Sequence, residues 1–249
     1  MRHLRAGLLA LSMAAACLGA ALICQPGFGQ GQAYKSVPVT LPTLLRDASF
    51  DAFRQQLARI VQKKDRAELA RVVAASFFWM PEESDIADKS LPPVDNLVKA
   101  LGLGDAIGWE SLAAYAEERT ASADPQRSGV FCAPADAVFD QNAADGLFDE
   151  THTEAGDWGF PIREGIEVRA DAKPDAAVID RLGAHLVRIL SESPAAENET
   201  FVKVLTPLGN VGFAPADSVL PLPGEQLCYT KETDGWKIAG FFWRRNELT

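Results

Sequence analysis

Histidine is scarce in this chain, and its scarcity excludes several kinds of metal and catalytic site. Only three histidines occur among 249 residues, and two of them, His152 and His185, lie beyond the first 33 residues. The sequence has no His-Glu-x-x-His helix and no other two-histidine spacing of the zinc kind. It also lacks a Gly-x-Ser-x-Gly nucleophile turn and a glycine-rich phosphate loop. We therefore expect a protein that is not an enzyme and that holds no metal or cofactor.

Basic residues are few as well. The chain has 24 Lys and Arg against 34 Asp and Glu, a formal net charge of -10. Arg2 and Arg5 are the only Lys, Arg, Asp or Glu residues among the first 33, so the remainder has 22 basic and 34 acidic residues, a charge of -12. A protein that binds nucleic acid needs a clustered basic face that releases counterions from phosphates. The composition therefore argues against nucleic acid as a partner.

Charge is missing altogether from residues 8–23, which follow the positive start of the chain. This pattern, closed by Gly31-Gln32-Ala33, is typical of a secretory signal peptide that is cut after a small-x-small site. The apolar run is shorter than the roughly twenty residues of a membrane-spanning helix. We expect residues 1–33 to be removed, Tyr34 to be the first mature residue, and the mature protein to be periplasmic or secreted without a membrane span.

Cysteine is limited to four residues. Cys17 and Cys24 fall within the leader, where a lipid on either one is the alternative to a soluble mature form. Cys132 and Cys228 remain, and in an oxidising compartment two distant cysteines are expected to form a disulfide. The bridge would need Cα atoms within roughly 4.4 to 6.8 Å, which would place residues 129–134 in the C-terminal β unit. A catalytic thiol at Cys132 is the rival interpretation.

Residues 34–122 are expected to form a helical domain. Ser49 is a candidate N-cap for a helix whose apolar residues recur at three and four positions, and Asp65 begins a second helix with Glu68 completing a capping box. The other expected elements are helices over 93–101 and 109–118 and a core segment or short strand over 74–79.

Residues 123–160 are expected to be an extended, acidic connecting segment. Seven residues with ligand-type side chains crowd into it: Asp136, Asp140, Asn142, Asp145, Asp149, Glu150 and His152. Their spacing comes close to a calcium loop but is one residue out of register. We prefer a solvated loop. A carboxylate-based envelope hydrolase using residues 136–154 is the alternative, because pairs of carboxylates leave little trace in a sequence.

Short apolar runs separated by turn residues dominate residues 161–249 and predict a small antiparallel β-barrel. A hairpin is expected at its end, because residues 227–230 and 236–239 flank an Asp234-Gly235 turn. Several of these runs resemble the bacterial SH3-like (SH3b) domain over residues 163–220. They are Ile166-Glu167-Val168-Arg169-Ala170, residues 177–184, Phe201-Val202-Lys203-Val204 and Gly212-Phe213-Ala214.

The resemblance implies a small β-barrel that in many exported proteins contacts cell-wall peptide or another protein. Family members commonly have tryptophan where this chain has Phe201 and Phe213. The expected fold is therefore α+β: an N-terminal helical unit, then a small SH3-like antiparallel β-barrel with an added C-terminal hairpin, the last two within residues 161–249.

The most consistent function is that of a non-catalytic exported binding module that contacts peptidoglycan or an envelope protein. Exposed aromatic side chains would give it a large contact area at low entropic cost. Tyr229 and Trp236, on opposite arms of the last hairpin, are the candidate binding residues, and burial of Trp236 in the core is the alternative. A structural envelope protein with no small ligand is a further alternative.

Overall fold

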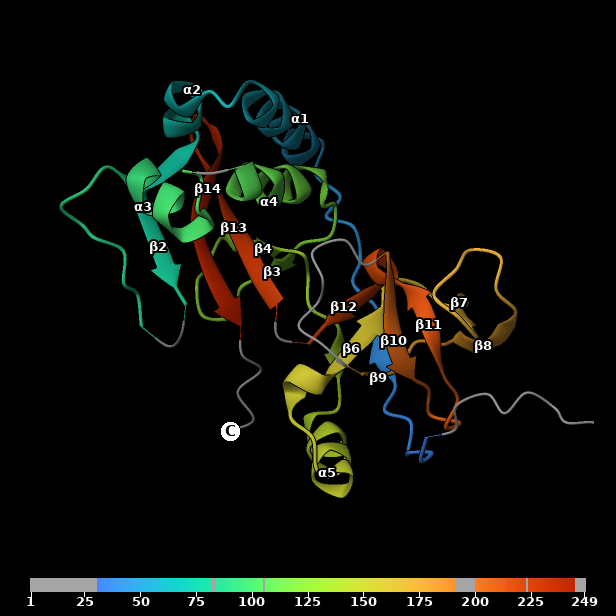
Figure 1. Ribbon diagram of the computed structural model, residues 1–249. Coiled ribbons are helices and arrows are strands. Elements are labelled where there is room, and N and C mark those ends of the chain that lie inside the picture. The colour runs from blue at the N-terminus through green and yellow to red at the C-terminus, as the bar shows by residue number, and fades with distance from the viewer. Residues whose placement is uncertain (1–30, 82–83, 105, 191–199, 223, 245–249) are drawn as a thin grey trace, which may run out of the picture.

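The chain builds two units, each with its own hydrophobic clusters (Figure 1). The computed structural model describes residues 31–81, 84–104, 106–190, 200–222 and 224–244. The core residues of the first unit come from 50–133 and 227–242, and those of the second come from 34–39 and 137–222. The second unit is therefore inserted into the first. We call them the host unit and the inserted unit.

The host unit contains a five-stranded sheet with the strand order β2-β14-β13-β4-β3. All neighbours are antiparallel except β14 and β2, which run parallel. The strands are β2 Val73–Met80, β3 Ser122–Ala123, β4 Val130–Ala133, β13 Gly224–Glu232 and β14 Gly235–Arg244. The last strand of the chain, β14, thus lies inside the sheet, between β2 and β13.

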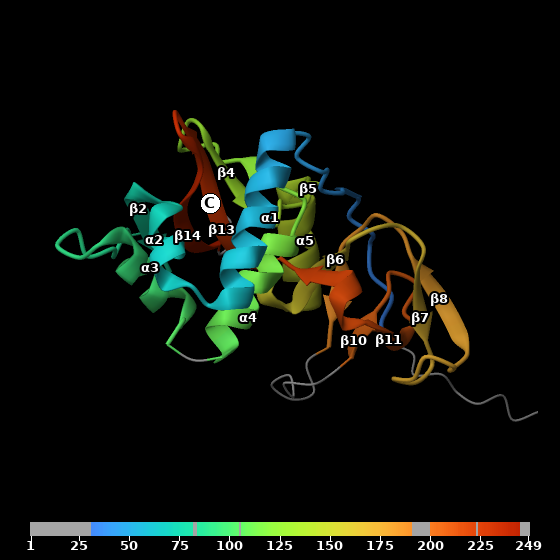
Figure 2. The same cartoon turned by 90° about the horizontal axis from the view of Figure 1, so that it is seen from above.

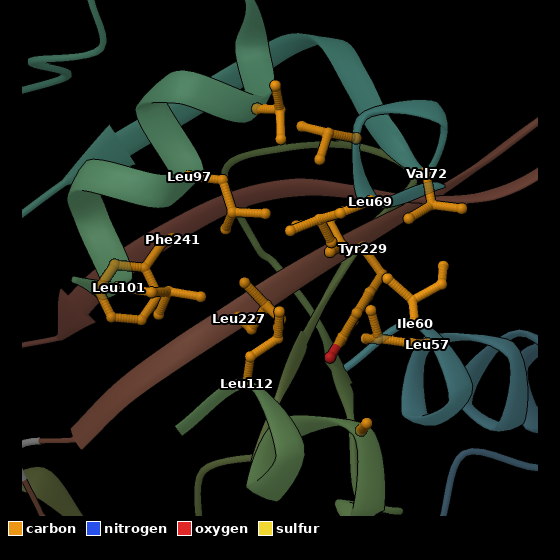
Figure 3. Packing of buried hydrophobic residues seen from close by; sticks show 14 of the residues in the cluster. Leu57, Ile60, Leu69, Val72, Leu97, Leu101, Leu112, Leu227, Tyr229 and Phe241 are labelled. Atoms are coloured by element: carbon orange, nitrogen blue, oxygen red, sulfur yellow. The ribbon is translucent and has the colours of Figure 1, made fainter. Parts of the chain in front are cut away.

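Four helices cover one face of this sheet (Figure 2). They are α1 Ala48–Lys63, α2 Arg66–Arg71, α3 Pro93–Leu101 and α4 Ala106–Glu117. Leu57, Leu97 and Leu112 from three of these helices meet Leu227 and Tyr229 of β13 in the core (Figure 3). The helices expected over 93–101 and 109–118 are confirmed, and the run 74–79 lies within strand β2.

The N-cap of α1 differs from the sequence expectation. Asp47, not Ser49, accepts the orphan amide hydrogens, from the backbone nitrogens of Ser49 at 2.7 Å and Phe50 at 3.3 Å. Both residue types cap helices well, so sequence could not separate two candidates that lie two positions apart. Asp65 caps α2 as expected, because its carboxylate accepts from the amides of Ala67 and Glu68.

The inserted unit contains a seven-stranded antiparallel sheet with the order β12-β6-β9-β10-β11-β7-β8. The strands are β6 Trp158–Pro161, β7 Ile166–Arg169, β8 Val178–Leu182, β9 Val187–Ile189, β10 Phe201–Leu205, β11 Val211–Pro215 and β12 Val219–Pro221. The α+β class is confirmed. In the part of the chain that the structure describes, the sheet keeps β12 and β8 as two edges, so it is not a closed barrel.

A second layer packs on part of this sheet. It comprises the two-stranded ribbon of β1 Val39–Thr40 and β5 Val138–Phe139, and helix α5 Gln141–Thr151. Two short 3-10 turns, Ala155–Asp157 and Ala216–Ser218, precede β6 and β12. We expected residues 123–160 to be an extended connector, and this is wrong. They supply strands to both units and form one helix. Asp140 caps that helix, and its apolar face, Ala144, Leu147 and Phe148, is buried.

We expected the terminal hairpin β13–β14 to be an addition to the β-barrel. Instead it belongs to the host sheet. One face of the hairpin carries Leu227, Tyr229, Trp236 and Ile238, which are all buried under the helices. Residues 129–134 do join this hairpin, through β4. No helix within the described residues is long and apolar enough to span a membrane.

Candidate functional site

Tyr229 and Trp236 are core residues, so the expectation that they line a ligand surface is wrong. Tyr229 is fully buried and Trp236 is 5% exposed. Their rings pack on Phe50 of α1 at centroid distances of 5.1 and 4.9 Å. The indole nitrogen of Trp236 donates to the Ser49 hydroxyl, and burial raises the pKa of the Tyr229 phenol. The alternative interpretation, that Trp236 fills the core, is confirmed.

Cys132 and Cys228 form the expected disulfide. The two residues lie directly opposite each other on β4 and β13, with an S–S distance of 2.10 Å and Cα atoms 4.0 Å apart, slightly closer than the expected range. Both are almost completely buried. The bridge occupies both sulfurs, so Cys132 is not a free nucleophile in this structure.

The acidic residues expected in a loop are spread over α5 and its flanks. Asp140 caps the helix, Asp145 accepts from Gln141 at 3.2 Å, and Asp136 accepts from Gln226 of β13 at 3.2 Å. A calcium loop is therefore wrong for this segment. No group of three or more His, Cys, Asp or Glu side chains in the described ranges is arranged to hold a metal ion.

A partly exposed aromatic and cationic surface lies on β10, β11, β7 and β8 of the inserted unit. Across the sheet, Lys203 is opposite Phe213, which is opposite Arg169. In the adjacent row, Phe201 of β10 is opposite Pro215 of β11. Directly opposed residues, and residues two apart on one strand, share a face of the sheet. We call this surface the Phe213 face, and its members are Glu167, Arg169, Arg181, Phe201, Lys203, Phe213 and Pro215.

The burial pattern shows that the Phe213 face points away from the inner core. Val168, Val204 and Ala214, which alternate with its members, have no exposed surface and pack against each other. Phe201 and Phe213 are half-buried and Arg181 is exposed. At one end the same side of the sheet continues into Leu205, which is covered by the N-terminal segment. The face thus begins where that cover ends.

Hydrogen bonds hold the two arginines of this face on a shared carboxylate. Arg169 and Arg181 both donate to the Glu167 carboxylate, one to each oxygen, the second at 2.7 Å. Arg169 also donates to the carbonyl of Ala176 at 2.7 Å. Two guanidinium groups thus share one carboxylate, which leaves a positive local charge and further N–H donors on a chain that is acidic as a whole.

Asp180 fastens β8 to the turn between β10 and β11. Its carboxylate accepts from the Thr206 hydroxyl at 2.7 Å and the Asn210 amide at 3.0 Å. Burial alone would raise the pKa of Asp180, but these hydrogen bonds outweigh it and lower the pKa. Burial lowers the pKa of the neighbouring His185, against an opposing effect of the Asp180 charge. The cluster positions the strand that carries Arg181.

From the sequence, Phe201 and Phe213 stand out only as positions at which SH3b domains commonly have tryptophan, and the arginines do not stand out. A signal was present, because polar or large residues alternate with small apolar ones along β7 and β11. Lys203 and Phe213 lie on the neighbouring strands β10 and β11, but the register that adds Arg169 to their row joins β11 to β7, a segment 44 residues earlier in the chain. No local pattern specifies such a pairing.

No family model matches this chain, and no curated protein or solved structure is significantly similar to it.

Proposed function

We propose that the chain is a non-catalytic exported binding module whose inserted unit is an SH3b-like domain that contacts a cell-wall or envelope protein component. The Phe213 face is the contact surface. The observation that carries this proposal is the row Lys203–Phe213–Arg169 on the outer side of the sheet. The Phe213 face takes the place of Tyr229 and Trp236 as the candidate binding surface, because those two residues are buried.

Two features support an SH3-like assignment for the inserted unit. The resemblance over 163–220 covers strands β7 to β12, which are three to five residues long and belong to one antiparallel sheet, in which β6 joins β12 to the others. Its inner core is small, with Ile166, Val168, Leu182 and four other buried residues. The resemblance therefore falls on most of the sheet of the inserted unit.

The chemistry of the face favours a ligand with carboxylates next to apolar groups. Half-buried phenyl rings provide contact area, and guanidinium groups recognise carboxylates through paired N–H donors. The peptides of bacterial cell walls carry free carboxylates beside small apolar side chains. Among the expected partners we therefore favour the peptide part of the cell wall over an envelope protein.

Sedimentation with purified cell-wall sacculi tests the assignment. We expect Arg181→Gln to weaken binding about tenfold, because a charge-assisted hydrogen bond contributes roughly 1.5 to 3 kcal/mol. Arg181 is exposed, with 60% of its side-chain surface accessible, so its replacement should leave the fold intact. The matched control is Arg59→Gln on the exposed side of α1, which should bind like the wild type.

Three outcomes separate the competing functions. Loss of sedimentation in Arg181→Gln and in Phe213→Ala, with melting temperatures near the wild-type value, supports the proposal. Equal binding by both variants and the wild type refutes the Phe213 face. A wild-type protein that neither sediments with sacculi nor retains an envelope protein in a pull-down would favour the purely structural role.

A further inference from the structure

Residues 31–40 are an integral part of the inserted unit. The amide of Gly31 donates to Gly209, and that of Val39 donates to Ala184. Val37 accepts from the amide of Leu186 and is 1% exposed. The segment thus runs antiparallel to residues 184–186, directly before β9, and along the β10–β11 turn.

Tyr34 anchors this segment. Its ring meets Trp158 edge to face at a centroid distance of 4.9 Å. Its hydroxyl lies 2.9 Å from the carbonyl of Leu205 and 3.2 Å from that of Leu186. The backbone amide of Tyr34 donates to Pro207 at 3.1 Å. Only 9% of the residue is exposed, whereas Gln32 and Ala33 are exposed.

We infer that the Ala33–Tyr34 bond is a processing site that folding of the inserted unit closes, so that the leader must be removed before this unit folds. The inference rests on the export half of the proposed function. A peptidase binds an extended chain on both sides of the bond that it cuts. In the folded protein the residue after the bond is the buried one, and its backbone amide is held by Pro207.

The order of synthesis leaves time for the cut. The carbonyls that receive the Tyr34 hydroxyl lie 152 and 171 residues further along the chain. At about 5 to 20 residues per second, those partners follow Tyr34 after about 8 to 35 s. During that interval the two carbonyls that anchor the Tyr34 hydroxyl are still absent.

The cut also creates an ammonium group on Tyr34, at a position where the folded unit supplies a hydrogen-bond acceptor. One water molecule adds to the carbonyl carbon of Ala33, the C–N bond breaks, and the proton released by the new carboxylic acid passes to the amine. Tyr34 then carries an ammonium group at the nitrogen that donates to Pro207. A charged donor strengthens that hydrogen bond. The contact of Gly31 with Gly209 is lost with the leader.

An order-of-addition experiment tests the inference with the full chain, unfolded in denaturant and diluted into detergent under oxidising conditions. Purified bacterial signal peptidase is present during dilution or is added after folding is complete. Mass spectrometry follows the appearance of a product that begins at Tyr34. We expect cleavage at least tenfold slower when the enzyme is added to folded protein. Equal rates in both orders would overturn the inference.

Two matched variants show whether the protection is local. Leu205→Ala removes a side chain that packs by Gly31 in the inserted unit, and Leu97→Ala removes a leucine that is also buried, in the host core. Leu205→Ala should restore cleavage of folded protein and Leu97→Ala should not. Equal cleavage of both variants would overturn local protection. Absence of cleavage in either order would overturn the processing site itself, while sacculus binding would still report separately on the Phe213 face.

Discussion

Arg54 lies on α1, and its side chain caps the C-terminus of another helix, α4. One guanidinium nitrogen lies 2.9 to 3.3 Å from the carbonyls of Ala116, Glu117 and Glu118, at the end of α4. The other nitrogen donates to Asp51 at 2.9 Å. A helix terminus leaves carbonyls without intrahelical partners and favours a cation. Arg54 thus provides hydrogen-bond donors for the free carbonyls at the end of α4 and links α4 to α1.

We expect Arg54→Met to lower the free energy of unfolding by about 2 to 4 kcal/mol, because methionine keeps the apolar stem but leaves buried carbonyls unsatisfied. Urea unfolding followed by circular dichroism measures the loss. Arg59→Met, on the exposed side of the same helix, should change stability by less than about 0.5 kcal/mol. Similar losses in the two variants would contradict the capping role.

His185 should make the inserted unit sensitive to mild acid. Burial lowers its pKa in the folded protein below the ordinary value of 6.5, so the unfolded chain binds the proton more readily. The stabilisation is present above pH 6.5 and is lost as the pH falls below it. Asp180 from β8, the nearby charge, loses its own contribution only at much lower pH because its pKa is lowered.

Urea titrations between pH 7.5 and 5 measure this effect. We expect stability to fall with pH in the wild type and to fall less steeply in His185→Gln, which keeps a polar side chain but does not titrate. His152→Gln, on an exposed histidine after α5, serves as the control. A slope that is the same in His185→Gln and in the wild type would be evidence against His185 as the titrating group.

Elements whose signals are local were predictable from the sequence. The helices over 93–101 and 109–118 and the cap at Asp65 follow from periodicity and capping residues. Helix α5 was missed because Gly146 and several acids interrupt its apolar pattern, although Ala144, Leu147 and Phe148 mark a buried face at helical spacing. The pairing of Cys132 with Cys228 was predictable because only these two cysteines lie beyond residue 33, and distant cysteines of an exported chain are expected to pair.

Pairings between distant strands were not predictable in this way. The sequence shows that β13 and β14 form a hairpin but not which sheet receives it. Its neighbours β4 and β2 lie about 95 and 160 residues earlier in the chain. The error about Tyr229 and Trp236 follows directly, because their faces are buried only when helices from the N-terminal part cover the hairpin.

The disulfide between β4 and β13 should contribute strongly to the host sheet. We expect the double variant Cys132→Ala, Cys228→Ala to lose about 2 to 5 kcal/mol of stability, while sacculus binding at low temperature stays unchanged because the Phe213 face lies in the other unit. Thermal unfolding and sedimentation measure the two effects. Non-reducing peptide mapping provides the chemical check, and two free thiols in the exported, folded protein would contradict the bridge.

At the scale of the whole molecule, the separate cores predict that the host unit can fold without its insert. The chain leaves the host sheet after Ala133 and returns at Gly224, on the adjacent strands β4 and β13. We expect a chain of residues 41–133 and 224–249, joined by a short Gly-Ser turn, to show helical circular dichroism and a cooperative melting transition. A gradual, non-cooperative melt would indicate that the two units depend on each other.

The insert should behave differently when it is isolated. Residues 135–222 alone lack Tyr34, Val37 and Val39, which belong to one of its two cores. We expect this fragment to melt at a lower temperature than the same fragment carrying residues 34–40 through a flexible linker. Identical melting temperatures would show that the N-terminal segment adds nothing to stability.

The disulfide also alters how the protein would respond to mechanical load. The bond joins residues 96 positions apart, so a chain pulled from its two ends transmits tension through the sulfurs and bypasses everything between them. A contour length of about 320 to 350 Å stays hidden until the bond is reduced. Tension would pull residues 34–40 off the inserted unit, and after that the unit would lie outside the path of the tension and carry no force.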